Sequence, residues 1–454
     1  MSVREFMYDR ANLILLVGPL ADDVVRALPA AIADHILSSE GSELRRRHTD
    51  GQRWSHPSSR AVTALLPDVL MMDEPGLDPA EIAVRVAEAG YRGLPISVHM
   101  SGAHAAFMLP HDLFDGIAAW KHINAIFTRA TGAQPKPPRG RPLRFPVAAT
   151  LRNQNLVSAS RVKEIQRLRK ASEEAAATGP QFPDGIVIDR LRRLSGLSYV
   201  RLSHDDLQRF KASWSGVPGG ARLYFRLAEL VVRALEAAAP PDLDFPLRMM
   251  VDVRRYAPHG ARITGPFASD IPLGTLRTGD NSAAALAERV DRFVDAKVPL
   301  TGFTLDLAYL STRRLRHPFR SPERRTRIHQ APIMLSILPC QMPAKSWASE
   351  GDRLCAGLGM HPDYVATPYV QICRMNDGVH VTLWDELGCF EKGAFESVIR
   401  GAMSDDDNAP RQASAAERGS KEGLGDGPKV DLGDGPKDVP ERGSSNPVLV
   451  PERV

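Results

Sequence analysis

The chain has 454 residues, 43% of them hydrophobic, which is enough to build two packed lobes. Its formal net charge of +4 is small for this length and argues against a protein that is drawn to nucleic acid by overall charge. No run of about 18 apolar residues is present, and the apolar run at 13–17 is too short for a signal peptide. We therefore expect no integral membrane segment and a cytoplasmic location.

The cysteines argue against a zinc site or a redox dithiol. They are widely spaced and form no CxxC pair, which is typical of buried thiols: Cys340, Cys355, Cys373 and Cys389. No cluster of Asp, His and Cys points to another metal, so we expect none.

The first elements alternate between strand and helix. Residues 11–17 read as a strand, and residues 21–37 as a helix in which Pro29 should cause a kink or a split. Residues 77–89 predict a second helix, with Asp78 as its cap and Pro79 at its first position.

A hairpin and a short polar motif follow. Residues 95–100 and 104–109 both read as strands, joined by a tight turn at 102–103, and a helical period begins after Gly116. The loop between strand and helix contains His111, Asp115 and Gly116, an HxxxDG motif that is expected well under once by chance in a chain of this composition. The residues alone leave two interpretations open: a catalytic histidine, or a hydrogen-bonded loop histidine beside an N-cap aspartate.

The later part of the chain divides into further regions. A Pro-rich connection at 134–142 and a charged helix at 161–177 precede a break at 178–185, where we place the boundary between the lobes. Beyond it we expect helices at 221–238, 281–296 and 391–403, a strand at 247–255 and a hairpin at 369–384 that turns at 376–378. The expected domains are an N-terminal lobe (1–178) carrying HxxxDG, a C-terminal lobe (186–403) and a disordered tail (404–454). Because strands and helices mingle without a regular βαβ repeat, the fold class is a two-lobed α/β sandwich.

One segment is rich in arginine, with seven between Arg313 and Arg327. Such a run is typical of a solvated, mobile loop. The functional alternative is a docking patch for phosphates or an acidic carrier protein, because guanidinium groups bind phosphate bidentately. Only Phe319 interleaves with the arginines, so nucleic acid is a poor candidate.

The strand, HxxxDG loop and helix together resemble the chloramphenicol acetyltransferase-like superfamily, which includes condensation domains of nonribosomal peptide synthetases and polyketide-associated acyltransferases. The strand at 247–255 followed by 265–274 resembles the arginine-ending strand and Gly-Asn segment of the family, and the run that starts at Ser336 resembles its Ser-Asn-Leu-Gly segment. Pro110, Pro266 and Ile337 stand where the family commonly has His, Asn and Asn.

The resemblance implies roles for individual residues. His111 would be the general base, and Asp115 would turn away from it and pair with Arg254 from the other lobe. The period-2 pattern of the strand leaves a second partner for Arg254, its neighbour Asp252. Gly116 would leave room for a pantetheine arm in a tunnel between the lobes, and Ser336 would stabilise the oxyanion.

The resemblance also implies a function. We expect an acyltransferase that moves an acyl group from a coenzyme A or carrier-protein thioester to a hydroxyl or amine acceptor, in natural-product or lipid biosynthesis. The thioester would be a cosubstrate, with no permanently bound cofactor, and the partners would be a small-molecule acceptor and an acyl or peptidyl carrier protein. Two alternatives stay open: a free-standing condensation enzyme that joins carrier-bound units by an amide, and a non-catalytic relative that binds a carrier or partner protein.

Overall fold

The structure is a computed structural model, and all of its described elements belong to one compact unit, residues 1–407. It describes residues 12–38, 42–49, 53–55, 57–111, 113–136, 140–143, 145–156, 163, 167, 170, 186–187, 197–212, 223–263, 265–316, 327–328, 332–338, 354–360, 368–375, 378–385 and 388–403. Most of the predicted helix at 161–177, the break at 178–185 and the tail at 404–454 lie outside these residues. The predicted domain boundaries therefore stay predictions.

The first sheet has five strands in the order β15-β1-β6-β5-β4. Their bounds are β15 (Leu354–Met360), β1 (Asn12–Gly18), β6 (His104–Pro110), β5 (Ser97–Ser101) and β4 (Leu70–Met72). All neighbours are antiparallel except β4 and β5. The apolar run of β1 is explained by burial of both of its faces. Leu13, Leu15 and Val17 join one core cluster, whereas Ile14 and Leu16 join another.

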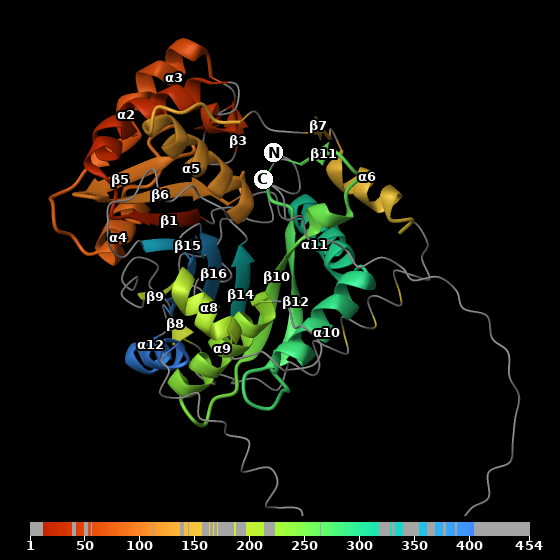
Figure 1. Ribbon diagram of the computed structural model, residues 1–454. Helices are drawn as coiled ribbons and strands as arrows, with labels where there is room; N and C mark the ends of the chain where they lie inside the picture. The colour runs from red at the N-terminus through yellow and green to blue at the C-terminus, as the bar shows by residue number, and fades with distance from the viewer. Residues whose placement is uncertain are drawn as a thin grey trace, which may run out of the picture. The chain divides into compact units, whose positions relative to one another are not determined.

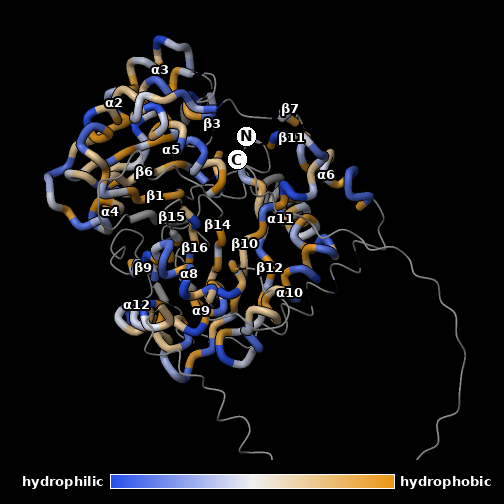
Figure 2. Tube along the Cα trace, in the orientation of Figure 1, coloured by the Kyte–Doolittle hydropathy of each residue, from blue (hydrophilic) through white to orange (hydrophobic). Residues whose placement is uncertain are grey.

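Helices cover both faces of this sheet (Figure 1). On one side lie α2 (Asp22–Leu37), α3 (Ser59–Leu65) and α5 (Gly116–Ala130), and on the other lies α4 (Pro79–Ala89). The tube in Figure 2 is orange along β1 and alternates between orange and blue along α2, as expected for a helix with one face on the core. Smaller elements between α2 and α3 are η1 (Ser42–Arg45), β2 (Arg47–Thr49) and β3 (Arg53–Ser55), and η2 (Leu66–Asp68) follows α3.

The second sheet has six strands in the order β12-β10-β14-β16-β17-β9. Their bounds are β12 (Ala268–Thr275), β10 (Pro246–Asp252), β14 (Ile333–Leu338), β16 (Tyr369–Met375), β17 (Gly378–Trp384) and β9 (Leu197–Ser203). β14 is parallel to both of its neighbours, and the other pairs are antiparallel.

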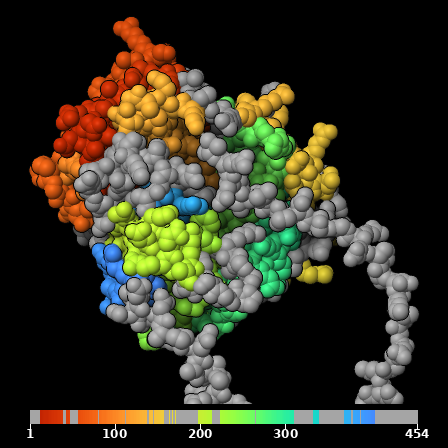
Figure 3. Space-filling view, viewed as in Figure 1, coloured from red at the N-terminus to blue at the C-terminus, as the bar shows by residue number. Residues whose placement is uncertain are grey.

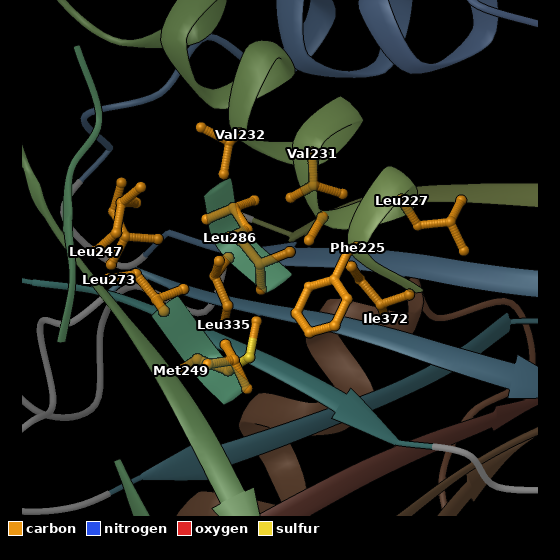
Figure 4. Close-up of a cluster of buried hydrophobic side chains, with 14 of the residues drawn as sticks. Phe225, Leu227, Val231, Val232, Leu247, Met249, Leu273, Leu286, Leu335 and Ile372 are labelled. Atoms are coloured by element: carbon orange, nitrogen blue, oxygen red, sulfur yellow. The ribbon is translucent and has the colours of Figure 1, made fainter. Parts of the chain in front are cut away.

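One face of the second sheet packs on helices α8 (His204–Ala212), α9 (Leu223–Ala238), α10 (Ala283–Asp295) and α12 (Lys392–Gly401). Figure 4 shows this core, where Phe225, Val231 and Val232 of α9 meet Met249 of β10 and Leu335 of β14. The space-filling view shows α8 and α9, in yellow-green, at the surface over this sheet (Figure 3). Helix α11 (Val298–Arg316) contributes Phe303 to the same core.

The two sheets do not follow the chain order strictly, and each core includes side chains from the other part of the chain. β15 follows β14 in the chain but pairs with β1 of the first sheet. Leu338, Cys373 and Met375, from strands of the second sheet, belong to the core cluster of the first. In the opposite sense, α6 (Pro146–Asn153) and the adjoining Leu156 pack on the second core, and β7 (Arg141–Pro142) pairs with β11 (Ala261–Arg262). A last pair joins β8 (Ile186–Val187) and β13 (Arg327–Ile328).

Several predicted elements are confirmed. The hairpin of β5 and β6 turns at residues 102–103, α4 begins at Pro79, and α9, α10, α12 and the hairpin of β16 and β17 lie where the sequence places them. Within the part of the chain that the structure describes, no helix is long and apolar enough to cross a bilayer.

Three expectations need correction. Of the kink or split expected at Pro29, the split does not occur, because α2 runs through it from Asp22 to Leu37, held by the buried residues Val24, Leu28 and Ile32 on its inner face; the kink stays a prediction. The strand expected at 247–255 ends at Asp252 and continues as the short 3-10 helix η3 (Val253–Tyr256). The arginine run is not a loop throughout, because α11 extends to Arg316, while residues 317–326 lie outside the described residues.

Candidate active site

The motif loop, residues 111 and 113–115, connects the end of β6 to the start of α5. The Pro110 carbonyl accepts hydrogen bonds from the backbone N–H groups of Leu113 and Phe114, both at 3.1 Å, which folds the loop into a turn. Leu113 and Phe114 are buried in the core of the first sheet, whereas His111 is only partly buried. The two apolar side chains therefore anchor the loop, whereas the His111 side chain stays partly exposed.

Asp115 is buried and accepts three hydrogen bonds. Its Oδ1 accepts from the Ala118 backbone N–H at 2.9 Å, which makes it the N-cap of α5. Its Oδ2 accepts from Arg254 Nη1 at 2.6 Å and from the Phe267 backbone N–H at 3.1 Å. The N-cap interpretation and the pairing with Arg254 are therefore compatible, and the structure contains both.

These contacts keep the Asp115 carboxylate ionised. Burial by itself would raise its pKa, but the charge of Arg254 and the hydrogen bonds from Arg254, Ala118 and Phe267 together lower the pKa below its usual value. The same pairing raises the pKa of Arg254 against the opposing effect of burial. Both partners are thus charged across the ordinary pH range.

Arg254 lies in η3 and makes four side-chain hydrogen bonds. Besides the bond to Asp115, Nη1 donates to Asp252 Oδ1 at 3.1 Å, Nε donates to the Ile263 carbonyl at 3.2 Å, and Nη2 donates to the Gly265 carbonyl at 2.6 Å. A guanidinium has five N–H groups, so nearly all of its donors are used. Arg254 acts as a fixed connection and is not available as a ligand for a substrate.

The strand pattern explains only part of this geometry. Leu247, Met249 and Val251 face the core as the period-2 pattern predicts, but the extended strand ends before Arg254. Asp252 ends it by accepting from the Arg254 backbone N–H at 3.0 Å, which caps the 3-10 turn. Arg254 therefore contacts both candidate partners, Asp115 and Asp252, because the turn directs its guanidinium between the two carboxylates.

Asp252 differs from Asp115 in its electrostatics. Burial and the nearby Asp115 charge raise its pKa, and the charge and hydrogen bonds of Arg254 offset only part of this increase. The side chain is 34% exposed, compared with 6% for Asp115. The cluster of two carboxylates and one guanidinium has a formal charge of −1 when both acids are ionised.

Gly116 lies against Leu338 of β14, the strand that also carries Ser336. A Cβ placed on Gly116 would lie 3.5 Å from Leu338 Cδ1, an ordinary contact distance. Because side chains alternate along a strand, Ser336 and Leu338 share one face of β14, the face that approaches the start of α5. Ser336 is buried at that face.

The structure thus brings Asp115, Gly116 and Arg254 together next to the motif loop, with the Ser336 strand beside them. The catalytic role of His111, the oxyanion role of Ser336 and the tunnel stay predictions. The sequence did not point to the carbonyls of Ile263 and Gly265 or to the N–H of Phe267, because backbone groups leave no residue signature. Among the described residues, no group of three or more His, Cys, Asp or Glu side chains is arranged to hold a metal ion.

No family model matches the chain, and no curated protein sequence does. A similar solved structure is the TRI3 trichothecene 15-O-acetyltransferase from Fusarium sporotrichioides, with 10% identity, 88% of this chain and 94% of that chain covered and a TM-score of 0.58.

Two further similar structures come from peptide synthetases. The first condensation domain of the CDA synthetase has 13% identity, 87% and 90% coverage of the two chains and a TM-score of 0.46. The epimerization domain of the third module of tyrocidine synthetase B has 12% identity, 88% and 91% coverage and a TM-score of 0.48. The acetyltransferase match confirms the predicted fold, the chloramphenicol acetyltransferase-like α/β sandwich.

Proposed function

We propose that this protein is an acyltransferase that transfers an acyl group from a thioester donor, coenzyme A or a phosphopantetheinyl carrier protein, to a hydroxyl or amine acceptor. The observation that carries the proposal is the ion pair between Asp115 and Arg254, which ties the HxxxDG loop of the first sheet to the end of β10 in the second. The acetyltransferase with the same fold supports it. The natural acceptor would be a small molecule of natural-product or lipid biosynthesis, and the reaction would take place in the cytoplasm.

His111 is the proposed general base. A neutral imidazole, with an ordinary pKa of about 6.5, is abundant at neutral pH and can accept a proton from the hydroxyl or amine group of the acceptor. The acceptor oxygen or nitrogen then forms a bond to the thioester carbonyl carbon, and the carbonyl oxygen takes the negative charge of the tetrahedral intermediate. Collapse of the intermediate breaks the C–S bond, and the imidazolium returns the proton to the departing thiolate.

Two other residues have supporting roles in this proposal. The Ser336 hydroxyl would donate a hydrogen bond to the oxyanion from the face of β14 that approaches Gly116. Asp115 does not take part in proton transfer, because its two oxygens are occupied by Ala118, Arg254 and Phe267. Its role is to fix the loop that carries His111.

The test is thiol release from octanoyl-CoA and from an octanoylated carrier protein, each with 1-hexanol or hexylamine as the acceptor. General-base catalysis contributes about 10²–10⁴-fold to a rate, so we expect His111→Ala to lower kcat by that factor without a change in the melting temperature. His259→Ala, an exposed histidine after η3, is the matched control and should keep full activity. Retention of turnover by His111→Ala, or no thiol release from either donor by the wild type, contradicts the proposal.

A further inference from the structure

Asp252 holds Arg254 at two points through a single oxygen. Its Oδ1 accepts from the Arg254 backbone N–H at 3.0 Å and from Arg254 Nη1 at 3.1 Å. The first bond fixes where β10 ends and η3 begins, and the second fixes the far end of the same side chain. One carboxylate oxygen therefore fixes both the backbone and the guanidinium group of Arg254.

Arg254 Nη1 donates to both carboxylates, Asp252 and Asp115. One of its two hydrogens is directed at Asp252 and the other at Asp115 Oδ2. Since the guanidinium is planar and rigid, the position of Asp252 sets the direction of the hydrogen that reaches Asp115. Asp115 in turn caps α5 four residues after His111.

The same arrangement includes the backbone before β12. Arg254 holds the carbonyls of Ile263 and Gly265, the Phe267 N–H donates to Asp115, and the Phe267 carbonyl accepts from the Val253 N–H at 2.9 Å. With three of its four contacts kept, Arg254 would remain bound to Asp115 without Asp252. Loss of Asp252 should therefore alter alignment and not abolish the pair.

From this geometry we propose that Asp252 is a positioning residue for the proposed acyl transfer, which orients Arg254 and, through Arg254 and Asp115, the loop that carries His111. The proposal rests on the proposed function. The cap of η3 alone does not explain this side chain, because a serine could cap the turn without adding a like charge close to the ionised Asp115. A role in alignment explains why this side chain carries an oxygen that reaches both the Arg254 backbone N–H and Nη1.

Two substitutions separate the cap from the guanidinium contact. Asp252→Ser keeps an N-cap oxygen for the Arg254 backbone N–H but is too short to hold Nη1. Asp252→Asn keeps an oxygen for both hydrogen bonds and removes only the charge. Asp270→Asn is the matched control, because Asp270 forms a carboxylate–arginine pair with Arg248 on the same sheet, without contact to Arg254.

We expect Asp252→Ser to lower kcat by about 10-fold with KM unchanged, since small misplacements of catalytic groups cost up to about 100-fold. Its melting temperature should stay within about 2 °C of the wild type, and hydrogen–deuterium exchange should increase at residues 111–118 and in the neighbouring segments 253–256 and 263–267, but not elsewhere. Asp252→Asn should keep kcat within about threefold, and Asp270→Asn should match the wild type in every measurement.

The outcomes distinguish this inference from the proposed function. If His111→Ala, measured alongside with octanoyl-CoA, keeps its turnover, the proposed function fails. If His111→Ala is inactive but Asp252→Ser matches the wild type in kcat and in exchange at 111–118, only the positioning role is wrong. If Asp252→Ser unfolds or raises exchange throughout the chain, Asp252 has a structural role and the inference is also wrong. The exchange measurement needs no substrate, so it decides the inference even if neither donor is used.

Discussion

Replacement of Asp115 by alanine should destabilise the protein strongly, because three interactions are lost at a buried position. Breaking a buried ion pair by removing one partner costs about 3–5 kcal/mol, and loss of an N-cap costs about 0.5–2 kcal/mol. The side chains of Asp115 and Arg254 are only 6% and 15% exposed, so solvent screening reduces these values little. Since Arg254 keeps its bond to Asp252, we take about 4–5 kcal/mol as the total for Asp115→Ala.

Asp115→Asn is the informative companion variant. Asparagine is as good an N-cap as aspartate, so the bond to Ala118 should survive. The charge is lost, and the amide nitrogen that replaces Oδ2 cannot accept from Arg254 and Phe267. We expect the alanine effect less the retained cap, about 3 kcal/mol. Followed by far-UV circular dichroism, these losses correspond to decreases in melting temperature of about 9 °C for Asp115→Ala and about 6 °C for Asp115→Asn, at roughly 2 °C per kcal/mol for a chain of this size.

The pH dependence of the melting temperature also tests the Asp115–Arg254 ion pair. The pKa of Asp115 is lowered on folding, so its contribution is fully present above the unfolded value of about 3.9 and is lost as the pH falls through the folded pKa. The difference in melting temperature between the wild type and Asp115→Asn should be constant from pH 8 to pH 5 and should shrink below about pH 4. A melting temperature of Asp115→Ala within about 2 °C of the wild type at pH 7 would refute the assignment of a strong buried pair.

Two further predictions concern polar side chains outside the cluster of Asp115, Asp252 and Arg254. His35 Nε2 on α2 and His122 Nδ1 on α5 lie 3.0 Å apart. Burial and the charges of His122 and Arg129 lower the pKa of His35 to about 3. Burial and the charge of Lys121 lower the pKa of His122 to about 4, against the opposing charge of Glu43. The unfolded chain binds protons at these two histidines below about pH 6.5, whereas the folded chain does not, so the melting temperature should fall as the pH is lowered from about 6.5 to 4. The double variant His35→Leu/His122→Leu should show a smaller decrease over this range. An equal decrease in the wild type and the double variant would contradict the prediction. Thr382 of β17 is 1% exposed, and its Oγ1 has no hydrogen-bond partner among the described residues, so Thr382→Val should leave the melting temperature unchanged or raise it, whereas a decrease of more than about 3 °C would reveal a partner.

The local parts of the fold were predictable because their signals are local. The turn at residues 102–103, the start of α4 at Pro79 and the N-cap role of Asp115 each depend on a few adjacent residues whose side chains or backbone freedom select one conformation. The apolar run of β1 identified it as a strand. Its neighbours could not be derived, since β1 pairs with β15, more than 300 residues later in the chain, and register over that distance is set by the packing of the whole molecule.

The ion pair between Asp115 and Arg254 was predictable in its residues and less so in its geometry. The resemblance supplied Asp115 and Arg254 as partners, whereas strand alternation alone left Asp252 as an equal candidate. Neither argument indicated that a cap at Asp252 ends β10 and turns the arginine toward both acids. A carboxylate two residues before an arginine at the end of a strand is a signal of such a turn, because aspartate side chains bind backbone N–H groups two residues further on.

The cluster of Asp115, Asp252 and Arg254 is better explained by orientation than by stability. Buried ion pairs can often be replaced by apolar residues without loss of stability, so the Asp115–Arg254 pair is weak evidence of a need for stability. Asp252 adds a second negative charge whose pKa is raised by its surroundings, a sign that the folded protein disfavours its ionised form. What the three side chains provide together is direction: Arg254 uses four donors, Asp115 uses both oxygens, and the segment before β12, the end of β10 and the start of α5 are held in one arrangement. That arrangement fixes the loop that ends in Asp115 and begins at His111, which is the requirement of a proposed base that must meet an acceptor and a thioester carbon at the same place.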